Sequence, residues 1–297
     1  MKYVVVIPAK NEEEGIKVTL DSVINQKIKP LLVYVADDNS TDRTAEIVKE
    51  YSGKYDFVKY HLVNGEDNYV LGAKIVKIFN KIKKLIDNSG TDYDFIVKMD
   101  ADISFEPDFF SRIAEAIEGD NFGIISGTPY YIDEGKKIFV KSPSWHTNGD
   151  FKIYNRKCLT DIGQIPENLG WDTADNILAL QKGWKTEAFY DINYKQTRPI
   201  GRYSVAKGKE RQGKGAYKLG YDPLYLTLRT AHDLLKPPVF VGAASFLKGY
   251  FKAMFKGTTK TLDKEQSRLL RKLLWGSLSE RFRSKSFYMF QIISAKR

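Results

Sequence analysis

The sequence predicts an α/β protein built on a mostly parallel central sheet that is flanked by helices. Short apolar runs alternate with amphipathic segments through about the first 130 residues. These runs are apolar throughout, which is typical of strands that are covered on both faces. Each run is followed by polar residues, and ligands of such sheets bind beyond the carboxyl ends of the strands.

The predicted strands are β-branched, apolar runs that end at Pro, Gly or polar residues. They are residues 3–7, 31–36, 58–63, 95–99 and 122–128. The predicted helices between them have apolar residues at helical spacing. They occupy residues 16–26, a segment after the capping residues Ser40, Thr41 and Asp42, residues 71–86, and a segment that starts at Pro107.

Composition limits the class of protein. The chain has 297 residues, of which 42% are hydrophobic and 28% charged, as in ordinary folded proteins. Its one cysteine, Cys158, excludes an internal disulfide, and we interpret it as a small buried apolar residue. The first apolar run is too short for a secretory signal, so we expect a cytoplasmic protein without a membrane-spanning helix.

Charge is distributed unevenly. The net charge is +10, yet residues 201–297 hold 21 basic and 6 acidic side chains, while residues 1–200 hold 26 basic and 31 acidic ones. This asymmetry indicates an anionic partner for the basic part. Nucleic acid, anionic lipid and a phosphorylated substrate all fit that description.

The carboxyl-terminal part begins with a Gly- and Lys-rich stretch that we expect to be a loop, and continues with helices at 222–235, 239–256 and 263–281. The second of these helices combines an aromatic stripe with lysines spaced at four. The stripe is Phe246, Tyr250, Phe251, Met254 and Phe255, and the lysines are Lys248, Lys252 and Lys256. Two interpretations stay open: a helix in the interface of an anionic membrane, on its inner face, or a helix packed on the domain.

Acidic residues follow two of the predicted strands. Asp37 and Asp38 end one strand, and Asp100 and Asp102 end another. Carboxylates suit a hard divalent cation such as Mg²⁺ or Mn²⁺, which commonly binds one or two carboxylates together with substrate phosphates. A D-x-D pattern alone is weak, because solvated turn acids have the same appearance.

Four segments, taken in order, resemble the family 2 glycosyltransferases with the GT-A fold. They are VVVIPAKNEE at 4–13, VADDNSTDRT at 35–44, KMDAD at 98–102 and GWDTADNILALQKGW at 170–184. The resemblance covers about residues 1–200 and implies a GT-A domain there. It implies an inverting transferase that uses a nucleoside-diphosphate sugar and Mg²⁺ or Mn²⁺. Residues 201–297 would then be a basic, aromatic-rich helical extension for acceptor or membrane association.

The resemblance also implies roles for particular residues. The donor-binding residues would be Pro8, Ala9, Glu12, Asp38 and Asp100, and the metal ligands would be Asp102 and Asp100. Lys74 and Arg198 match positions near the donor diphosphate, although both are also compatible with exposed basic residues. A histidine that relatives often carry before Arg198 is absent here, which leaves the protein ligands of the metal open.

The resemblance places the catalytic base at the start of a helix. An inverting transfer needs a carboxylate that takes the proton of the acceptor hydroxyl. The usual Glu-Asp pair is Trp171-Asp172 here, so Asp172 is the candidate base and Asp175, one turn further, is the alternative. Helix capping would equally explain an acid at this position.

Other classes remain to be weighed. A nucleotidyltransferase would need glycines where this chain has PAKNEEEG. A catalytically inactive relative that binds sugar nucleotide or anionic lipid is compatible with the altered Glu-Asp pair. A nucleic-acid binder is suggested only by the basic carboxyl terminus, and we expect no nucleic-acid partner. We expect the acceptor to be a saccharide or a polyprenyl-phosphate-linked glycan precursor.

Overall fold

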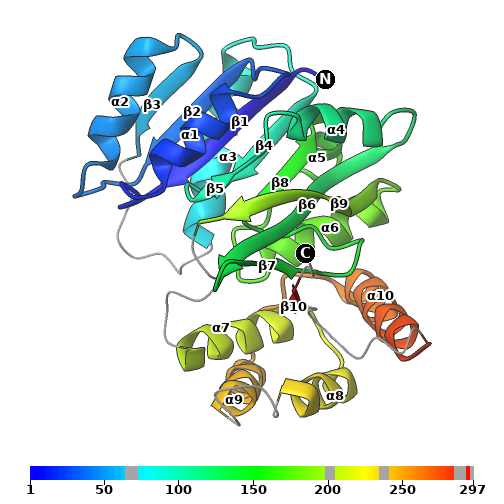
Figure 1. Cartoon of the computed structure of the whole chain (residues 1–297). Coiled ribbons are helices and arrows are strands. Elements are labelled where there is room, and N and C mark those ends of the chain that lie inside the picture. Colours follow the sequence, from blue (N-terminus) through cyan, green and yellow to red (C-terminus); the bar gives the residue numbers. More distant parts are fainter. Residues whose placement is uncertain (64–72, 198–204, 234–240, 284–291, 295–297) are drawn as a thin grey trace.

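The computed structural model describes residues 1–63, 73–197, 205–233, 241–283 and 292–294. Its strands form one sheet in the order β10-β7-β6-β8-β4-β1-β2-β3, and β9 pairs with β5 and β6 beside this path. Helices cover the sheet, and a group of carboxyl-terminal helices lies beyond one end of it (Figure 1).

One half of the sheet is parallel, as predicted. β1 (Tyr3–Ala9) lies between β2 (Leu32–Asp37) and β4 (Phe95–Met99), and β2 pairs with β3 (Val58–Leu62). Because successive side chains of a strand point to opposite faces, β1 contributes to two cores. One core lies under α1 (Ile16–Ile24) and α2 (Thr44–Lys54), and the other lies against α3 (Ala73–Asn88).

The rest of the sheet is largely antiparallel, although β9 runs parallel to β6, so the sheet as a whole is mixed. β8 (Phe151–Asn155) runs antiparallel to both β4 and β6 (Phe122–Asp133), and β7 (Lys136–Val140) forms a hairpin with β6. The remaining elements here are β5 (Ile103–Ser104), α4 (Phe109–Ala116), α5 (Arg156–Ile162), α6 (Trp171–Gln181) and β9 (Lys185–Gln196). Hairpin connections permit this arrangement, whereas parallel pairs need crossovers.

The carboxyl-terminal part is helical, and three of its helices match the prediction. They are α8 (Pro223–Asp233), α9 (Val241–Phe255) and α10 (Lys264–Arg283). The expected loop was wrong, because α7 (Val205–Lys218) is a helix within the Gly- and Lys-rich stretch. The short β10 (Ile292–Ser294) pairs with β7. No helix in the described ranges combines the length and apolarity that crossing a bilayer requires.

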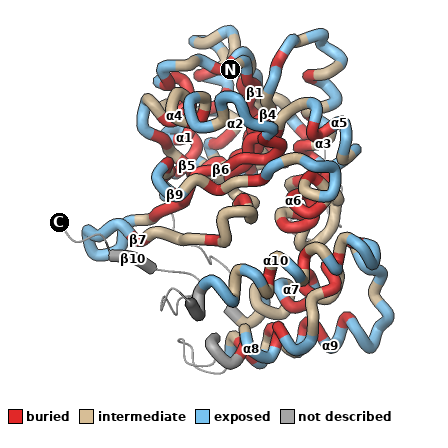
Figure 2. Tube along the Cα trace, turned by 90° about the vertical axis from the view of Figure 1, so that its right-hand side faces the viewer, coloured by how far each residue is buried: buried red, intermediate tan, exposed pale blue. Residues whose placement is uncertain are grey.

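Two glycines allow α7 and α9 to cross closely, and this packing stabilises α7 as a helix. A Cβ atom on Gly213 would lie 1.9 Å from the backbone oxygen of Phe246, and one on Gly249 would lie 1.9 Å from that of Glu210. The axes of α7 and α9 therefore approach more closely than side chains would permit. Packing of Phe246 and Tyr250 at this crossing offsets the low helix propensity of glycine. Figure 2 shows buried positions along both α7 and α9.

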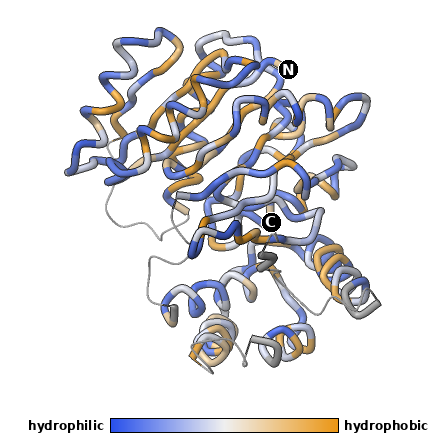
Figure 3. The backbone as a smooth tube through the Cα atoms, viewed as in Figure 1, coloured by the Kyte–Doolittle hydropathy of each residue, from blue (hydrophilic) through white to orange (hydrophobic). Residues whose placement is uncertain are grey.

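α10 connects the helical group to the sheet. Leu270 and Leu274 pack with Ala174 and Ile177 of α6 in one apolar cluster. The hydrophobic stripe of α10 is visible along the helix in Figure 3. The helix that carries the candidate base is therefore covered from outside by the carboxyl-terminal part of the chain.

We predict that Gly213→Ala destabilises the protein by about 1–3 kcal/mol, because the added methyl group overpacks the α7–α9 crossing. Gly208→Ala is the matched control on the same helix, since a Cβ there meets nothing within 4 Å. That substitution is expected to be neutral or to stabilise by about 0.5–1 kcal/mol. Urea unfolding of both variants measures the difference, and equal effects would contradict the close crossing.

Candidate active site

Carboxylates gather at one edge of the sheet because β1, β2 and β4 are parallel and end there together. Asp38 directly follows β2, while Asp100 and Asp102 follow β4. Pro8 and Ala9 end β1, and the backbone N–H of Asp38 donates to the carbonyl of Ala9 at 2.8 Å. The structure therefore brings together the predicted donor-side residues of all three strands.

Asp38 is buried, and its surroundings are basic. It is 4% exposed, and its Oδ2 lies 2.6 Å from Lys74 Nζ and 3.6 Å from Lys10 Nζ. Its Oδ1 is buried and accepts no hydrogen bond from the part of the chain that the structure describes. An unsatisfied buried carboxylate oxygen is costly, so this atom is suited to accept a hydrogen bond from a ligand.

Asp37 has a different role. Its Oδ1 accepts hydrogen bonds from the backbone and hydroxyl of Ser40, and its Oδ2 accepts one from Tyr60 at 2.9 Å. These bonds hold the loop after β2. Both Asp37 oxygens thus accept hydrogen bonds within the described residues, whereas Asp38 Oδ1 accepts none there.

The loop after β1 is held against the loop after β2. The backbone N–H of Thr41 donates a hydrogen bond to Asn11 Oδ1 at 2.8 Å. The backbone of Asn11 itself is left-handed, with φ 54°. The backbone N–H of Glu12 donates to Thr44 Oγ1 at 2.8 Å, and its carbonyl accepts from Ile16 at the start of α1. Glu12 thus lies at the junction of β1, α1 and α2.

The D-x-D segment is held from two sides. Lys98, which is 2% exposed, forms an ion pair with Asp100 Oδ1 and donates to the carbonyl oxygen of Gly149 at 2.6 Å. On the other side, a Cβ on Gly15 would lie 2.9 Å from the carbonyl oxygen of Ala101 and 3.2 Å from Asp102 Cα. The start of α1 therefore packs directly against Asp102.

The residues present fit a divalent cation at Asp102. Carboxylate oxygen is a preferred ligand of Mg²⁺ and Mn²⁺, whereas Asp100 is already paired with an ammonium group. No group of three acidic, histidine or cysteine side chains suited to a metal occurs among the described residues. This donor set matches a cation that takes part of its coordination from substrate phosphates.

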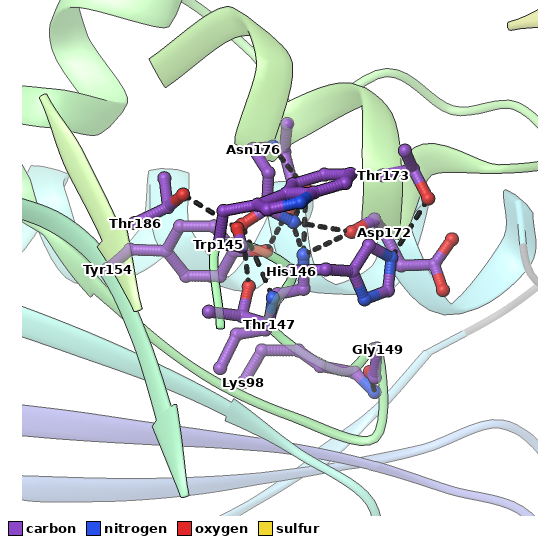
Figure 4. Close-up of polar contacts among 12 residues, drawn as sticks. Lys98, Trp145, His146, Thr147, Gly149, Tyr154, Asp172, Thr173, Asn176 and Thr186 are labelled. Atoms are coloured by element: carbon purple, nitrogen blue, oxygen red, sulfur yellow. Dashed lines mark hydrogen bonds and ion pairs between the residues drawn. The ribbon is translucent and has the colours of Figure 1, made fainter. Parts of the chain in front are cut away.

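Asp172 lies in the first turn of α6, after Gly170 in a left-handed conformation with φ 82°. A Cβ on Gly149 would lie 3.0 Å from Asp172 Cβ and 3.4 Å from its Oδ2. A side chain at this position would crowd Asp172 and Trp171, so glycine favours the close approach of the loop before β8 to the carboxylate. Figure 4 shows the Asp172 side chain beside His146, whose Nε2 hydrogen-bonds Thr173 Oγ1 at 2.9 Å.

Asp175, the alternative base, is enclosed. It is 0% exposed, and its two oxygens lie 2.7 and 2.8 Å from Lys152 Nζ, with Tyr154 donating to Oδ2 at 2.7 Å. The same ammonium donates to the backbone oxygen of Asp172 at 2.7 Å. Asp175 therefore supports the helix that carries Asp172 and has no access to an acceptor hydroxyl.

Trp171 covers the two buried lysines. The Nζ atoms of Lys98 and Lys152 lie 5.5 and 5.3 Å from its ring centroid, and the side chain is 7% exposed. This geometry permits a cation–π interaction with each ammonium. The residue thus fills the space beneath the helix.

Asp150 is a neighbour of the site that the sequence analysis did not identify. It accepts hydrogen bonds from Tyr194 at 2.9 Å and from Gln196, and its carbonyl accepts from the backbone of Asp100. Burial and the nearby Asp100 charge raise the pKa of the Asp150 carboxyl to about 6. The sequence carries no local signal for this residue, because Asp150 comes to lie opposite Asp100 only when β8 pairs with β4.

Two other predictions concern single residues. Cys158 is fully buried, and burial raises the pKa of its thiol to about 12, which confirms an inert apolar role. Arg198 lies outside the described residues, so its role remains a prediction.

The mixed sheet, with carboxylates at the ends of its parallel strands, has the GT-A fold of the solved glycosyltransferase structures described below. The chain belongs to Glycosyl transferase family 2, whose profile matches residues 4–170. This confirms both the resemblance and the predicted fold.

Similar proteins agree with this assignment. The poly-beta-1,6-N-acetyl-D-glucosamine synthase of Staphylococcus epidermidis is 25% identical over 205 residues, which cover 62% of this chain and 45% of that protein. The chain spans 14% to 57% of the length of the curated relatives considered.

Two solved structures share the fold. The mannosyltransferase PcManGT from Pyrobaculum calidifontis, in complex with GDP-Man and Mn²⁺, aligns with a TM-score of 0.55 at 16% identity, over 96% of this chain and 83% of that one. S. aureus TarS 1-349 in complex with UDP-GlcNAc aligns with a TM-score of 0.53 at 16% identity, over 99% of this chain and 95% of that one.

We predict that Gly149→Ala lowers the rate of sugar-nucleotide turnover by about 100-fold, because the methyl group displaces the Asp172 carboxylate. The matched control is Gly53→Ala on α2, where a Cβ meets nothing within 4 Å. Release of free nucleotide from UDP- and GDP-sugars measures the rate. An unchanged rate in the Gly149 variant would show that this contact does not position Asp172.

Proposed function

We propose that the protein is an inverting, metal-dependent glycosyltransferase that transfers a hexose from a nucleoside-diphosphate sugar to a hydroxyl acceptor. The observation that carries this proposal is the meeting of Asp38, Asp100 and Asp102 at one sheet edge, with Asp172 held nearby through Gly149. The GDP-Man and UDP-GlcNAc complexes of the two structural neighbours support a sugar nucleotide as donor.

The donor would lie along the ends of β1, β2 and β4. Asp38 Oδ1, buried and without a hydrogen bond, would accept the imino N–H of uracil or guanine. Asp100 would bind the ribose. The other donor contacts we propose are Pro8, Ala9, Glu12, Lys74 and Arg198.

The chemistry is a single displacement. Asp172 takes the proton of the acceptor hydroxyl while the acceptor oxygen forms a bond to the anomeric carbon. The bond from that carbon to the diphosphate oxygen breaks, and its electron pair leaves with the nucleoside diphosphate. Mg²⁺ or Mn²⁺ on Asp102 would supply charge stabilisation for the leaving diphosphate. Attack opposite the leaving group inverts the anomeric configuration.

The altered Glu-Asp pair favours one second candidate, a catalytically inactive relative that binds sugar nucleotide or anionic lipid. Trp171 occupies the position of the usual acid and covers two lysines. Asp172 nevertheless keeps its place in the first turn of α6. We therefore favour the enzyme, and donor turnover decides between the two.

The partner of the helical extension, residues 201–297, is proposed to be an anionic membrane surface that presents a lipid-linked or other glycan acceptor. The aromatic stripe of α9 divides in the structure. Phe246 and Tyr250 are buried, whereas Phe251, Met254 and Phe255 are 42%, 36% and 82% exposed. Leu224 and Leu228 of the neighbouring α8 are also exposed, at 62% and 45%.

Charge around these exposed apolar side chains fits anionic lipid. Lys248 and Lys252 are 67% and 55% exposed, although both also form ion pairs with Glu210 of α7, at 3.5 and 3.2 Å. Lys256 follows one turn later. Each basic residue near such a surface contributes about 1 kcal/mol. Both α8 and α9 lie at the end of the molecule that faces away from the sheet (Figures 1 and 2).

We predict distinct losses for the two acids. Asp102→Asn should abolish metal-dependent nucleotide binding, since it removes the carboxylate proposed to hold the cation. Asp172→Asn should retain binding and lower turnover by about 100- to 10,000-fold. Calorimetry with UDP and GDP, and hydrolysis of their sugars with Mn²⁺, measure both. Asp133→Asn, at an exposed hairpin end, is the control.

Binding without turnover in the wild type would favour the inactive relative. The absence of donor binding, with or without metal, would reject the glycosyltransferase proposal.

A second prediction concerns the membrane. The double substitution Phe251→Ser and Phe255→Ser should weaken the affinity for phosphatidylglycerol vesicles, measured by sedimentation, by about ten-fold or more. The reason is that it removes two exposed aromatic rings that would otherwise be buried in the lipid. Leu31→Ser, which alters a side chain 41% exposed on the sheet domain, is the matched control. Equal binding of wild type to phosphatidylcholine vesicles, or retention on DNA at the same salt, would contradict an anionic membrane partner.

A further inference from the structure

Two buried lysines stand opposite each other in the middle of the sheet. Lys98 of β4 pairs with Lys152 of β8 in antiparallel register, and they are 2% and 0% exposed. Like charges directly across a strand pair are destabilising, and a buried ammonium needs compensating partners. Each of the two buried ammonium groups therefore needs acceptor groups that offset its charge.

The two lysines are compensated in different ways. Lys152 contacts Asp175 and the backbone oxygen of Asp172, which belong to one helix. Lys98 contacts Asp100 Oδ1, in the segment after β4, and the carbonyl oxygen of Gly149, in the loop before β8. These two groups lie on different sides of the site. Lys152 thus supports the base helix, whereas Lys98 connects the donor side with the base side.

The connection through Lys98 is short. Gly149 lies against Asp172, so one ammonium group joins Asp100 to the residue that borders the base. Figure 4 shows Lys98 and Gly149 beneath the turn that carries Asp172. The Lys98 side chain is 3% exposed and cannot reach a ligand, whereas that of Asp100 is 36% exposed and can.

We propose that Lys98 is a positioning residue that sets where Asp100 and Asp172 lie relative to each other. This inference rests on the proposed function. Lys98 orients the Asp100 carboxylate toward the donor, and through the Gly149 carbonyl it fixes the loop against which Asp172 rests. Loss of the ammonium would therefore weaken nucleotide binding and slow turnover together, although Lys98 itself touches no substrate.

A double-mutant cycle of Lys98→Met and Asp100→Asn tests this inference. The readouts are the Kd of UDP or GDP with Mn²⁺, whichever the wild type binds, and hydrolysis of the matching sugar nucleotide. Each single variant should raise the Kd about ten-fold, and the double variant should be no weaker than Asp100→Asn alone. Turnover of Lys98→Met should fall about 100-fold.

The control is the double variant Lys152→Met/Asp175→Asn, which removes the neighbouring buried charges and leaves both Lys98 contacts in place. Its nucleotide Kd should equal that of the wild type, and only its turnover should fall. If Lys98→Met does not fold, Lys98→Gln replaces it in the cycle, because the amide keeps one donor without charge.

Three results separate the outcomes. Non-additive Kd values with an unchanged Kd in the control support the inference. Additive effects, or a Lys98 variant that binds nucleotide as the wild type does, overturn it and leave Lys98 a structural residue. A wild type that binds neither UDP nor GDP overturns the proposed function itself.

Discussion

The site depends on the compensation of two like charges inside the protein. Lys98 and Lys152 face each other on β4 and β8 beneath the ring of Trp171, out of contact with water. An unpaired buried ammonium is costly, so acids and carbonyl groups must approach from both sides. Those groups come from the segment after β4, the loop before β8 and helix α6, so charge compensation links the three segments that form the candidate active site.

Topology supplies the rest of the arrangement. The ends of β1, β2 and β4 coincide because these strands are parallel, which places Asp38 and the D-x-D acids at one edge. The antiparallel β8 then brings its preceding loop, with Gly149, to the same edge. A donor side built on parallel strands and a base side reached through an antiparallel strand thus meet across a single pair, β4 and β8.

Much of the donor side could be predicted from local sequence. The run at 95–99 is apolar apart from Lys98 and is followed by Asp100, so both the strand and its acid could be predicted. The antiparallel half could not be predicted, because its pairing depends on contacts distant in sequence. The one sequence feature that could have pointed to Lys98 and Lys152 is a lysine within an otherwise apolar run. Helix α7 was missed because glycine is a poor helix former, and its packing partner Gly249 lies beyond the next helix.

The central claim is that Asp172 and the strand-end acids act on opposite sides of one anomeric carbon in a single displacement. Proton NMR of the sugar first released from an α-linked UDP- or GDP-sugar, recorded before mutarotation, tests this most directly. The account predicts the β-anomer, since water takes the place of the acceptor on the side of Asp172. Initial release of the α-anomer would show retention and contradict the account.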